Sequence, residues 1–134
     1  FHSHSYTGNA LGCRAGIATL GIFQQQGIIE KNKQLSEAMR KATAHFEDHP
    51  NIIEVRQTGM VLAIEFVKNK QTREPFAWQE RRGLKIYEYA LTKGVLMRPI
   101  ANVVYFVPPY VITEKQIQYL AQVAWDGIIL AVQD

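Results

Sequence analysis

The chain has 134 residues, of which 47% are hydrophobic and 20% charged, and this predicts one domain, or one domain with an arm, around a real core. No apolar stretch approaches the roughly 20 residues that a membrane span needs, so we expect no membrane insertion. The net charge of +3 comes from 15 basic and 12 acidic residues that are mixed along the chain. Such a weak excess argues against nucleic-acid binding.

The single cysteine, Cys13, cannot form a disulfide within the chain. Its apolar neighbours predict a buried packing thiol rather than a nucleophile. We therefore expect a reducing, cytoplasmic setting.

The chain opens on Phe1 and a polar, turn-prone run over residues 2–9. The missing initiator Met and signal-peptide pattern predict a piece of a longer protein. Within this run, Ser3, Ser5 and Thr7 stand just before a helix start, where hydroxyls and backbone N–H groups can bind a phosphate. An ordinary capped helix start would explain the same residues.

Two helices are expected next. Asn9 is a suitable N-cap for a small-residue apolar helix from Ala10 to Phe23 that ends at Gly27, and this helix should be buried over much of its circumference. Residues 28–49 place apolar side chains at helical intervals between charged ones, which predicts an amphipathic surface helix ending before Pro50.

Strands and helices then alternate. Residues 52–57 and 60–67 are rich in Val and Ile and predict an antiparallel hairpin around Thr58-Gly59. A loop over residues 68–75 precedes a helix over 78–93.

The last third of the chain predicts short strands over residues 95–98 and 103–107, on either side of Pro99. Thr113 should then cap a final helix that ends near Val132. The expected fold class is α+β: a small, mainly antiparallel sheet covered by helices on one face, preceded by a long linker helix.

Arg98 is the most informative single residue. Its guanidinium fork matches two carboxylate oxygens, and Pro99 and the pair Pro108-Pro109 restrict the backbone around it. This predicts a carboxylate receptor beside an aromatic-lined turn. A surface arginine near a strand end is the alternative that spacing alone leaves open.

Other candidate sites are weaker. His2 and His4 have no Cys or third His nearby, so no metal site is expected. His45 and His49 lie four apart on a helix but lack a metalloprotease context, and we expect them to be solvated. No Ser-His-Asp order, Cys-His pair or close carboxylate pair is present, so no complete active site is visible.

Three stretches resemble the C-terminal part of the class III, fold-type I aminotransferases that use pyridoxal phosphate. These are residues 2–13 (HSHSYTGNALGC), 55–65 (VRQTGMVLAIE) and 94–99 (GVLMRP). Ala10 stands where the family commonly has Pro, and Gly12 where it commonly has Ala. Both departures leave the helix assignment intact.

The resemblance implies that residues 1–27 form a phosphate-contacting loop and an inter-domain linker helix, and residues 28–134 a C-terminal small domain. It implies that the Ser5 hydroxyl reaches the cofactor phosphate of the neighbouring subunit in a homodimer. Arg98 would bind the substrate carboxylate, and Tyr105 would line the substrate pocket.

The closing run over residues 105–110 resembles the branch of this family that serves biotin biosynthesis. That branch converts 8-amino-7-oxononanoate to 7,8-diaminononanoate with S-adenosylmethionine as amino donor. In the family the Schiff-base lysine lies upstream of the position of Phe1, so we expect no catalytic residue in this chain and no activity from the chain alone.

Two alternatives stay open. The chain could be the same domain of another class III transaminase, of the ornithine or aminobutyrate type, although the ending Pro108-Pro109-Tyr110 argues against this. It could also be a stand-alone α+β module that binds a small anion through Arg98. The module would be a monomer, whereas the severed domain would expose apolar surface on the first helix and self-associate.

Overall fold

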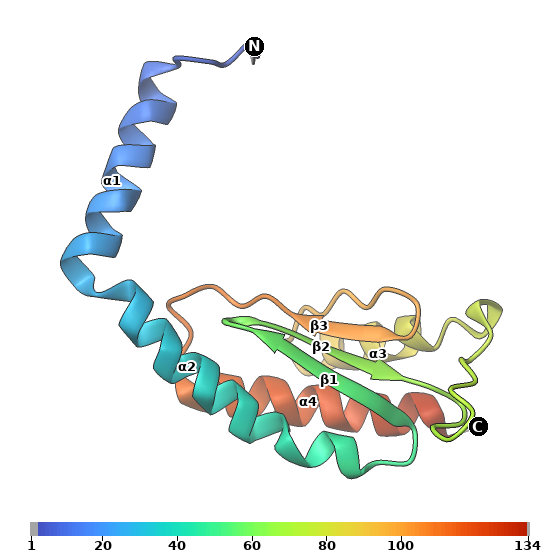
Figure 1. Ribbon diagram of the computed structural model, residues 1–134. Coiled ribbons are helices and arrows are strands. Elements are labelled where there is room, and N and C mark those ends of the chain that lie inside the picture. The colour runs from blue at the N-terminus through green and yellow to red at the C-terminus, as the bar shows by residue number, and fades with distance from the viewer. Residues whose placement is uncertain (1–2, 134) are drawn as a thin grey trace.

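The computed structural model describes residues 3–133 and shows a layered body with a projecting helix (Figure 1). Below, the arm means residues 3–27 and the body means residues 28–133. The elements in chain order are α1 (Ala10–Gln26), α2 (Ile28–Thr43), the 3₁₀ helix η1 (Ala44–Asp48), β1 (Ile52–Thr58), β2 (Val61–Phe66), the 3₁₀ helix η2 (Trp78–Glu80), α3 (Arg82–Thr92), β3 (Val103–Phe106) and α4 (Glu114–Val132).

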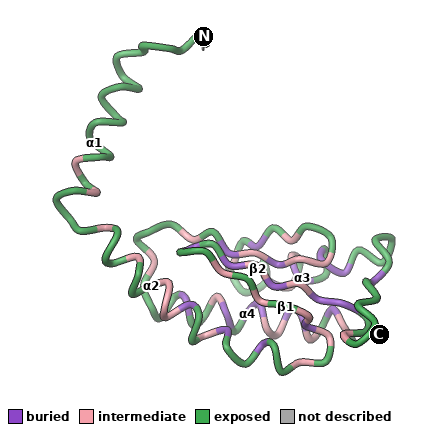
Figure 2. Tube along the Cα trace, viewed as in Figure 1, coloured by how far each residue is buried: buried purple, intermediate pink, exposed green. Residues whose placement is uncertain are grey.

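The sheet has three strands in the order β1-β2-β3, and both pairs are antiparallel. Burial alternates along each strand, so that Leu62 and Ile64 of β2 are fully buried while Ala63 and Glu65 are partly exposed. This period of two is what a sheet covered on one face produces. Helices α2, α3 and α4 cover the buried face (Figures 1 and 2), which confirms the predicted α+β layer.

The core lies between the sheet and the helices and is continuous. Its largest fully buried side chains are Phe46, Phe66, Met39, Ile52, Leu62, Ile64, Ile86, Met97, Ile117, Ile128 and Val104. At Gly127 of α4 a Cβ atom would lie 3.1 Å from Ile86 and 3.3 Å from Tyr89. The missing side chain therefore lets α3 and α4 approach closely.

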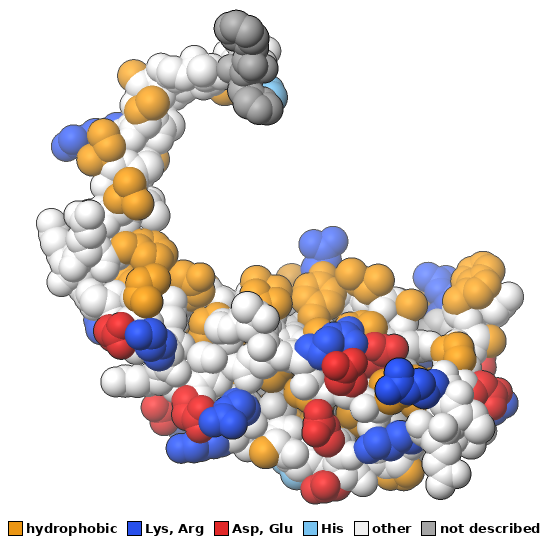
Figure 3. Space-filling model, in the orientation of Figure 1, with side chains coloured by type: hydrophobic (Ala, Val, Ile, Leu, Met, Phe, Trp, Pro, Cys, Tyr) orange, Lys and Arg blue, Asp and Glu red, His pale blue; other side chains and the backbone are white. Residues whose placement is uncertain are grey.

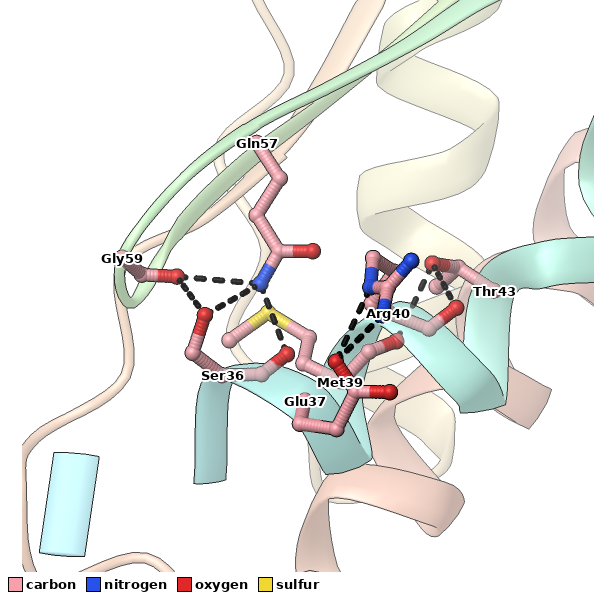
Figure 4. A network of polar contacts seen from close by, with 7 residues as sticks. All are labelled: Ser36, Glu37, Met39, Arg40, Thr43, Gln57 and Gly59. Atoms are coloured by element: carbon pink, nitrogen blue, oxygen red, sulfur yellow. Dashed lines mark hydrogen bonds and ion pairs between the residues drawn. The ribbon is translucent and has the colours of Figure 1, made fainter. Parts of the chain in front are cut away.

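A polar network joins α2 to the β1–β2 hairpin (Figure 4). The Gln57 Nε2 group donates to the Ser36 carbonyl at 2.8 Å and to the Gly59 carbonyl at 3.0 Å, and the Ser36 hydroxyl donates to the Gly59 carbonyl at 2.8 Å. Gly59 has φ +55°, a left-handed conformation that glycine adopts without strain. The tight turn is thus held against the helix that supports the sheet.

The arm projects from the body, and none of the residues of α1 is buried (Figures 1 and 2). Asn9 caps this helix by accepting from the Gly12 N–H at 2.8 Å, and Gly27 ends it with φ +58°, as predicted. The predicted burial is wrong within this chain, and so is that of Cys13, which is exposed. The reason is that the described chain places no layer against α1.

Figure 3 shows hydrophobic side chains along the arm. Leu11, Ile17 and Leu20 are 82%, 61% and 64% exposed. The exposed apolar surface expected for a severed domain is therefore present. The Phe23 ring makes an edge contact with Tyr110, at 6.0 Å between centroids, where the arm meets the body.

The predicted strand over residues 95–98 is wrong. The Val95 N–H donates to the Ala90 carbonyl at 2.9 Å and thereby closes the C-terminus of α3, with Gly94 at φ +69°. Pro99 has no N–H to add to a ladder. Residues 95–98 therefore run as an irregular segment, and β3 is the only strand in this region of the described chain.

Two of the three predicted body helices, those over residues 28–49 and 78–93, are interrupted. The first continues beyond Thr43 as the 3₁₀ helix η1, and the second begins as η2 and restarts at Arg82 after Arg81 adopts φ +48°. The prediction that His49 is solvated is wrong: it is half-buried, with its ring 5.5 Å from that of Trp125, and its Nδ1 accepts from the Asn51 N–H at 3.1 Å.

Within residues 3–133, no helix combines the length and apolar character that crossing a bilayer requires. The same residues contain no group of three His, Cys, Asp or Glu side chains that could hold a metal ion. His2, one half of the candidate pair with His4, lies outside the described residues.

Candidate functional site

Arg98 lies on the rim of an open hollow of about 600 Å³ in the body. The hollow is lined by Trp78, Arg81, Gly83, Leu84, Tyr87, Arg98, Pro99 and Ala101. One wall comes from η2 and the first turns of α3, and the other from the turn that follows Arg98. Two segments that are separated by residues 88–97 in the sequence thus share one concave surface.

The turn after Arg98 is tightly constrained. Ile100 and Val103 exchange two backbone hydrogen bonds, both at 2.9 Å, around Ala101 at φ +49°. The Asn102 side chain donates to the Phe76 carbonyl at 3.0 Å. With Pro99 fixing φ on the other side, the backbone beside Arg98 has little freedom.

Gly83 fixes the two walls against each other. A Cβ atom at this position would lie 2.6 Å from the Ala101 carbonyl oxygen and 3.0 Å from Pro99 Cβ. Any other residue would push α3 away from the turn. The closeness of the two walls, and so the shape of the hollow, depends on this glycine.

The Arg98 side chain is exposed, and it has no ion-pair partner among residues 3–133. An exposed guanidinium without a carboxylate partner can bind the carboxylate of a ligand by donating two parallel hydrogen bonds to it. Trp78, which is 76% exposed, and the half-buried Tyr87 add aromatic surface to the same hollow. This geometry suits a ligand with a carboxylate and an apolar part.

Tyr105 does not line this hollow. It lies on β3 opposite Ala63, on the sheet face that the helices leave uncovered, and is half-buried. The next residue across that face, on β1, is Arg56, which binds Glu54 at 2.7 Å and Glu65 at 2.8 Å. The hydrogen bonds that Arg56 donates to Glu65 and to Glu54 raise the pKa of Arg56.

Ser5 lies in an exposed turn that precedes α1, and Figure 1 shows that the N-terminal end of α1 points away from the body. Thr7 shapes that turn: its hydroxyl accepts from the His4 N–H, and its own N–H donates to the His4 carbonyl, both at 2.9 Å. The 17 residues of α1, about 25 Å of helix, separate Ser5 from the body. The chain therefore does not by itself bring Ser5 to Arg98 and Tyr105.

Comparison with known proteins places these features in a family. The family described as Aminotransferase class-III matches residues 1–125. The chain belongs to this family. Class III aminotransferases depend on pyridoxal phosphate.

Curated class III relatives include an adenosylmethionine-8-amino-7-oxononanoate aminotransferase from Methanocaldococcus jannaschii. It is 39% identical over 128 residues, which cover 96% of this chain and 28% of the relative. A putrescine–pyruvate aminotransferase from Pseudomonas aeruginosa is 33% identical over 125 residues, 92% of this chain and 27% of the relative. The chain thus spans little more than a quarter of the length of these relatives.

The crystal structure of the Methanocaldococcus jannaschii aminotransferase superimposes on this chain with a TM-score of 0.90 at 38% identity. The alignment covers 97% of this chain and 30% of that structure. The match confirms the fold expected from the resemblance to class III aminotransferases.

Sequence reasoning found Arg98 but missed the rest of the hollow. Arg81, Trp78 and Tyr87 carried no motif, because only the packing at Gly83 brings them to Arg98. The sole signal was local: the adjacent basic pair Arg81-Arg82 stands at a helix start. Of its two arginines, Arg82 is buried, with its guanidinium 4.0 Å from the Phe76 ring centroid and bonded to the Ala131 carbonyl, so it is structural.

Proposed function

We propose that this chain is the linker helix (residues 1–27) and the small domain (28–134) of an adenosylmethionine-8-amino-7-oxononanoate aminotransferase. The parent enzyme would convert 8-amino-7-oxononanoate to 7,8-diaminononanoate with S-adenosylmethionine as amino donor, in the cytoplasm. Support comes from the 39% identical relative of that name and from the run Arg98-Pro99 to Pro108-Pro109-Tyr110.

Arg98 carries the proposal. It is exposed beside aromatic surface, its backbone is held by Pro99 and the Ile100–Val103 bonds, and no carboxylate of the described chain neutralises it. A positioned guanidinium can orient a substrate through its carboxylate and leave the other end free to react. In this role Arg98 binds the acid end of 8-amino-7-oxononanoate.

Tyr105 is assigned to the substrate pocket and Ser5 to the cofactor phosphate of the neighbouring subunit in a homodimer. The position of Ser5 favours such a role, because its turn is exposed and lies beyond α1, away from the substrate residues of its own body. An arm that extends from one subunit can reach a second one. The exposed apolar side chains of α1 would be covered in that assembly.

The hydroxyl-rich turn fits a phosphate group. The Ser5 hydroxyl has no hydrogen-bond partner within residues 3–133 and is free to donate. When bound, pyridoxal phosphate carries the amino group between the donor and the acceptor. We assign the lysine that anchors it to a part of the parent outside this chain, so the residues present here bind and orient but do not transfer protons.

A second candidate is another class III transaminase, and the putrescine–pyruvate aminotransferase at 33% identity supports it. The acceptor distinguishes the two. An enzyme for 8-amino-7-oxononanoate must hold a carboxylate far from its reacting carbon, whereas pyruvate places the two groups side by side. Rates with each acceptor, measured on the same preparation, decide between them.

The test is a chimera in which residues 3–133 replace the matching segment of the Methanocaldococcus jannaschii enzyme, whose fold agrees at TM-score 0.90. We expect the chimera to form 7,8-diaminononanoate. Replacing Arg98 with Ala should lower kcat/KM for 8-amino-7-oxononanoate, because a charged group loses its paired hydrogen bonds. The expected loss of transition-state stabilisation is about 2–4 kcal/mol.

Arg73→Ala is the matched control, because Arg73 is also exposed and without an ion-pair partner in the described chain, yet lies outside the hollow. It should leave kcat/KM unchanged. An Arg98→Ala chimera with undiminished kcat/KM would overturn the assignment of Arg98. A folded chimera that accepts pyruvate but not 8-amino-7-oxononanoate would favour the second candidate.

A further inference from the structure

The arginines of the chain fall into two groups. Arg40, Arg56 and Arg82 are paired with carboxylates at 2.5–2.8 Å, and the hydrogen bond from Arg40 lowers the pKa of its partner Glu37. The other arginines, which have no ion-pair partner within residues 3–133, are Arg14, Arg73, Arg81 and Arg98. Two of these four, Arg81 and Arg98, line the same hollow.

Two like charges on one concave surface repel each other, and nothing of opposite sign offsets them there. The eight lining residues include no Asp or Glu. An anion placed between the two guanidiniums would remove the repulsion and gain attraction from both. The hollow therefore favours a negatively charged ligand over a neutral one.

The backbone of Arg81 is constrained by its conformation and by two hydrogen bonds. It adopts φ +48°, an uncommon conformation for a residue with a side chain. Its N–H donates to the Trp78 carbonyl at 3.2 Å, and its carbonyl accepts from the Leu84 N–H at 2.8 Å. Its backbone thus joins η2 to α3, and Gly83 fixes that junction against the turn after Arg98.

The remaining surface of the hollow is mostly apolar. Trp78 and Leu84 are 76% and 36% exposed, and Tyr87 and Pro99 are half-buried. An alkyl chain of several carbons that extends from a carboxylate would cover this surface. A short acid such as pyruvate would leave it in water.

We propose that Arg81 is a second carboxylate-binding residue, which shares the acid group of the substrate with Arg98, while the alkyl chain of that acid lies along Trp78, Leu84 and Tyr87. This inference rests on the proposed function for the role of Arg98 and adds a residue and a substrate class to it. The preferred ligands are medium-chain monocarboxylic acids, and selectivity over short acids comes from the apolar wall.

The test uses the 134-residue chain with octanoate as the probe at low ionic strength, and follows Trp fluorescence. Trp78→Phe should abolish the fluorescence change, because Trp125 lies away from the hollow, beside His45 and Phe46. Neutral octanamide should bind less tightly than octanoate. Added salt should weaken octanoate binding, since the charges are exposed and screened.

Arg81→Gly and Arg98→Gln should each raise the Kd for octanoate about three- to fivefold, as expected for exposed charge pairs. Glycine suits the left-handed backbone at position 81, so the variant should fold. Arg73→Gly is the matched control, because Arg73 is exposed, has φ +59° and lies outside the hollow. It removes the same charge and should leave the Kd unchanged. Thermal unfolding verifies that each variant is native.

The outcomes separate the two proposals. Weaker binding in both Arg81→Gly and Arg98→Gln supports the shared site. Weaker binding in Arg98→Gln alone overturns the role of Arg81 and leaves the proposed function standing. If neither substitution changes octanoate binding, both the shared site and the role of Arg98 are overturned. If the native chain does not bind octanoate, the shared site is overturned.

Discussion

The arm and the body use apolar residues in opposite ways. In the body, strands and helices bury one face each, and side chains such as Ile64, Phe66 and Ile128 are fully buried. In the arm, Leu11, Ile17 and Leu20 are more than half exposed, and no residue of α1 is buried. The body therefore accounts for its own stability, whereas the sequence of α1 suits a contact that residues 3–133 do not supply.

Two leucines give the largest test of this difference. Leu62 on β2 is fully buried, and Leu20 on α1 is 64% exposed. Leu62→Ala should lower the free energy of unfolding by about 2–5 kcal/mol, because it removes buried carbons and leaves a cavity. Leu20→Ala should change it by less than about 0.5 kcal/mol. Chemical denaturation followed by circular dichroism measures both, and similar losses would mean that the arm packs on the body.

Two glycines sharpen the comparison. At Gly83 in the body a Cβ would lie 2.6 Å from the Ala101 carbonyl oxygen, so Gly83→Ala should destabilise the chain by about 1–3 kcal/mol. It should also weaken octanoate binding, because the hollow changes shape. At Gly16 in α1 nothing lies within 4 Å, and Gly16→Ala should instead favour the helix by about 1 kcal/mol. Melting curves and the helical circular dichroism signal at 222 nm distinguish the two variants. Destabilisation by both substitutions would contradict the difference between the arm and the body.

The exposed side chains of the arm should make the isolated chain self-associate. Sedimentation velocity over a range of concentrations should show species larger than the monomer. Leu20→Glu should shift the distribution toward the monomer, whereas Val61→Glu, which changes a 48% exposed residue of the body, should not. A chain that stays monomeric at every concentration would favour the stand-alone module.

The smallest expected effect is a pH dependence of the body. Burial, and secondarily the charge of Lys70, lower the pKa of His49 below its usual value near 6.5. The folded state then binds fewer protons than the unfolded state. Stability is complete above about pH 6.5 and falls as the pH drops toward the lowered pKa. His49→Gln should flatten this part of the stability profile, and an unchanged profile would assign the dependence to other groups.

Local signals in the sequence were sufficient for most elements. Asn9 and Thr113 cap their helices through side-chain bonds to Gly12 and Gln116, and Gly27 ends the first helix. The Val- and Ile-rich composition of residues 52–57 and 60–67 predicted the antiparallel hairpin of β1 and β2 correctly. Each of these outcomes depends on residues a few positions apart, where propensity and hydrogen bonding act directly.

The predictions were wrong where the local structure depends on residues far apart in the sequence, or on a packing layer that the described residues do not contain. Residues 95–98 have strand-like composition, but the Val95 N–H is used by the C-terminus of α3. The α1 pattern predicted burial, yet its partner surface is not in the described chain. Arg81 could not be linked to Arg98 from the sequence, since 17 positions separate them and only the contact at Gly83 joins them. The roles of Ser5, Tyr105 and Arg98 in the parent remain predictions.

We propose that this chain orients the substrate in the parent enzyme, whereas the lysine that anchors the cofactor belongs to another part of that enzyme. The most direct measurement adds pyridoxal phosphate to the 134-residue chain, reduces with borohydride and locates any adduct by mass spectrometry. We predict only scattered, substoichiometric labelling of exposed lysines. A single lysine labelled one-to-one would contradict the account, because the chain would then carry cofactor chemistry of its own.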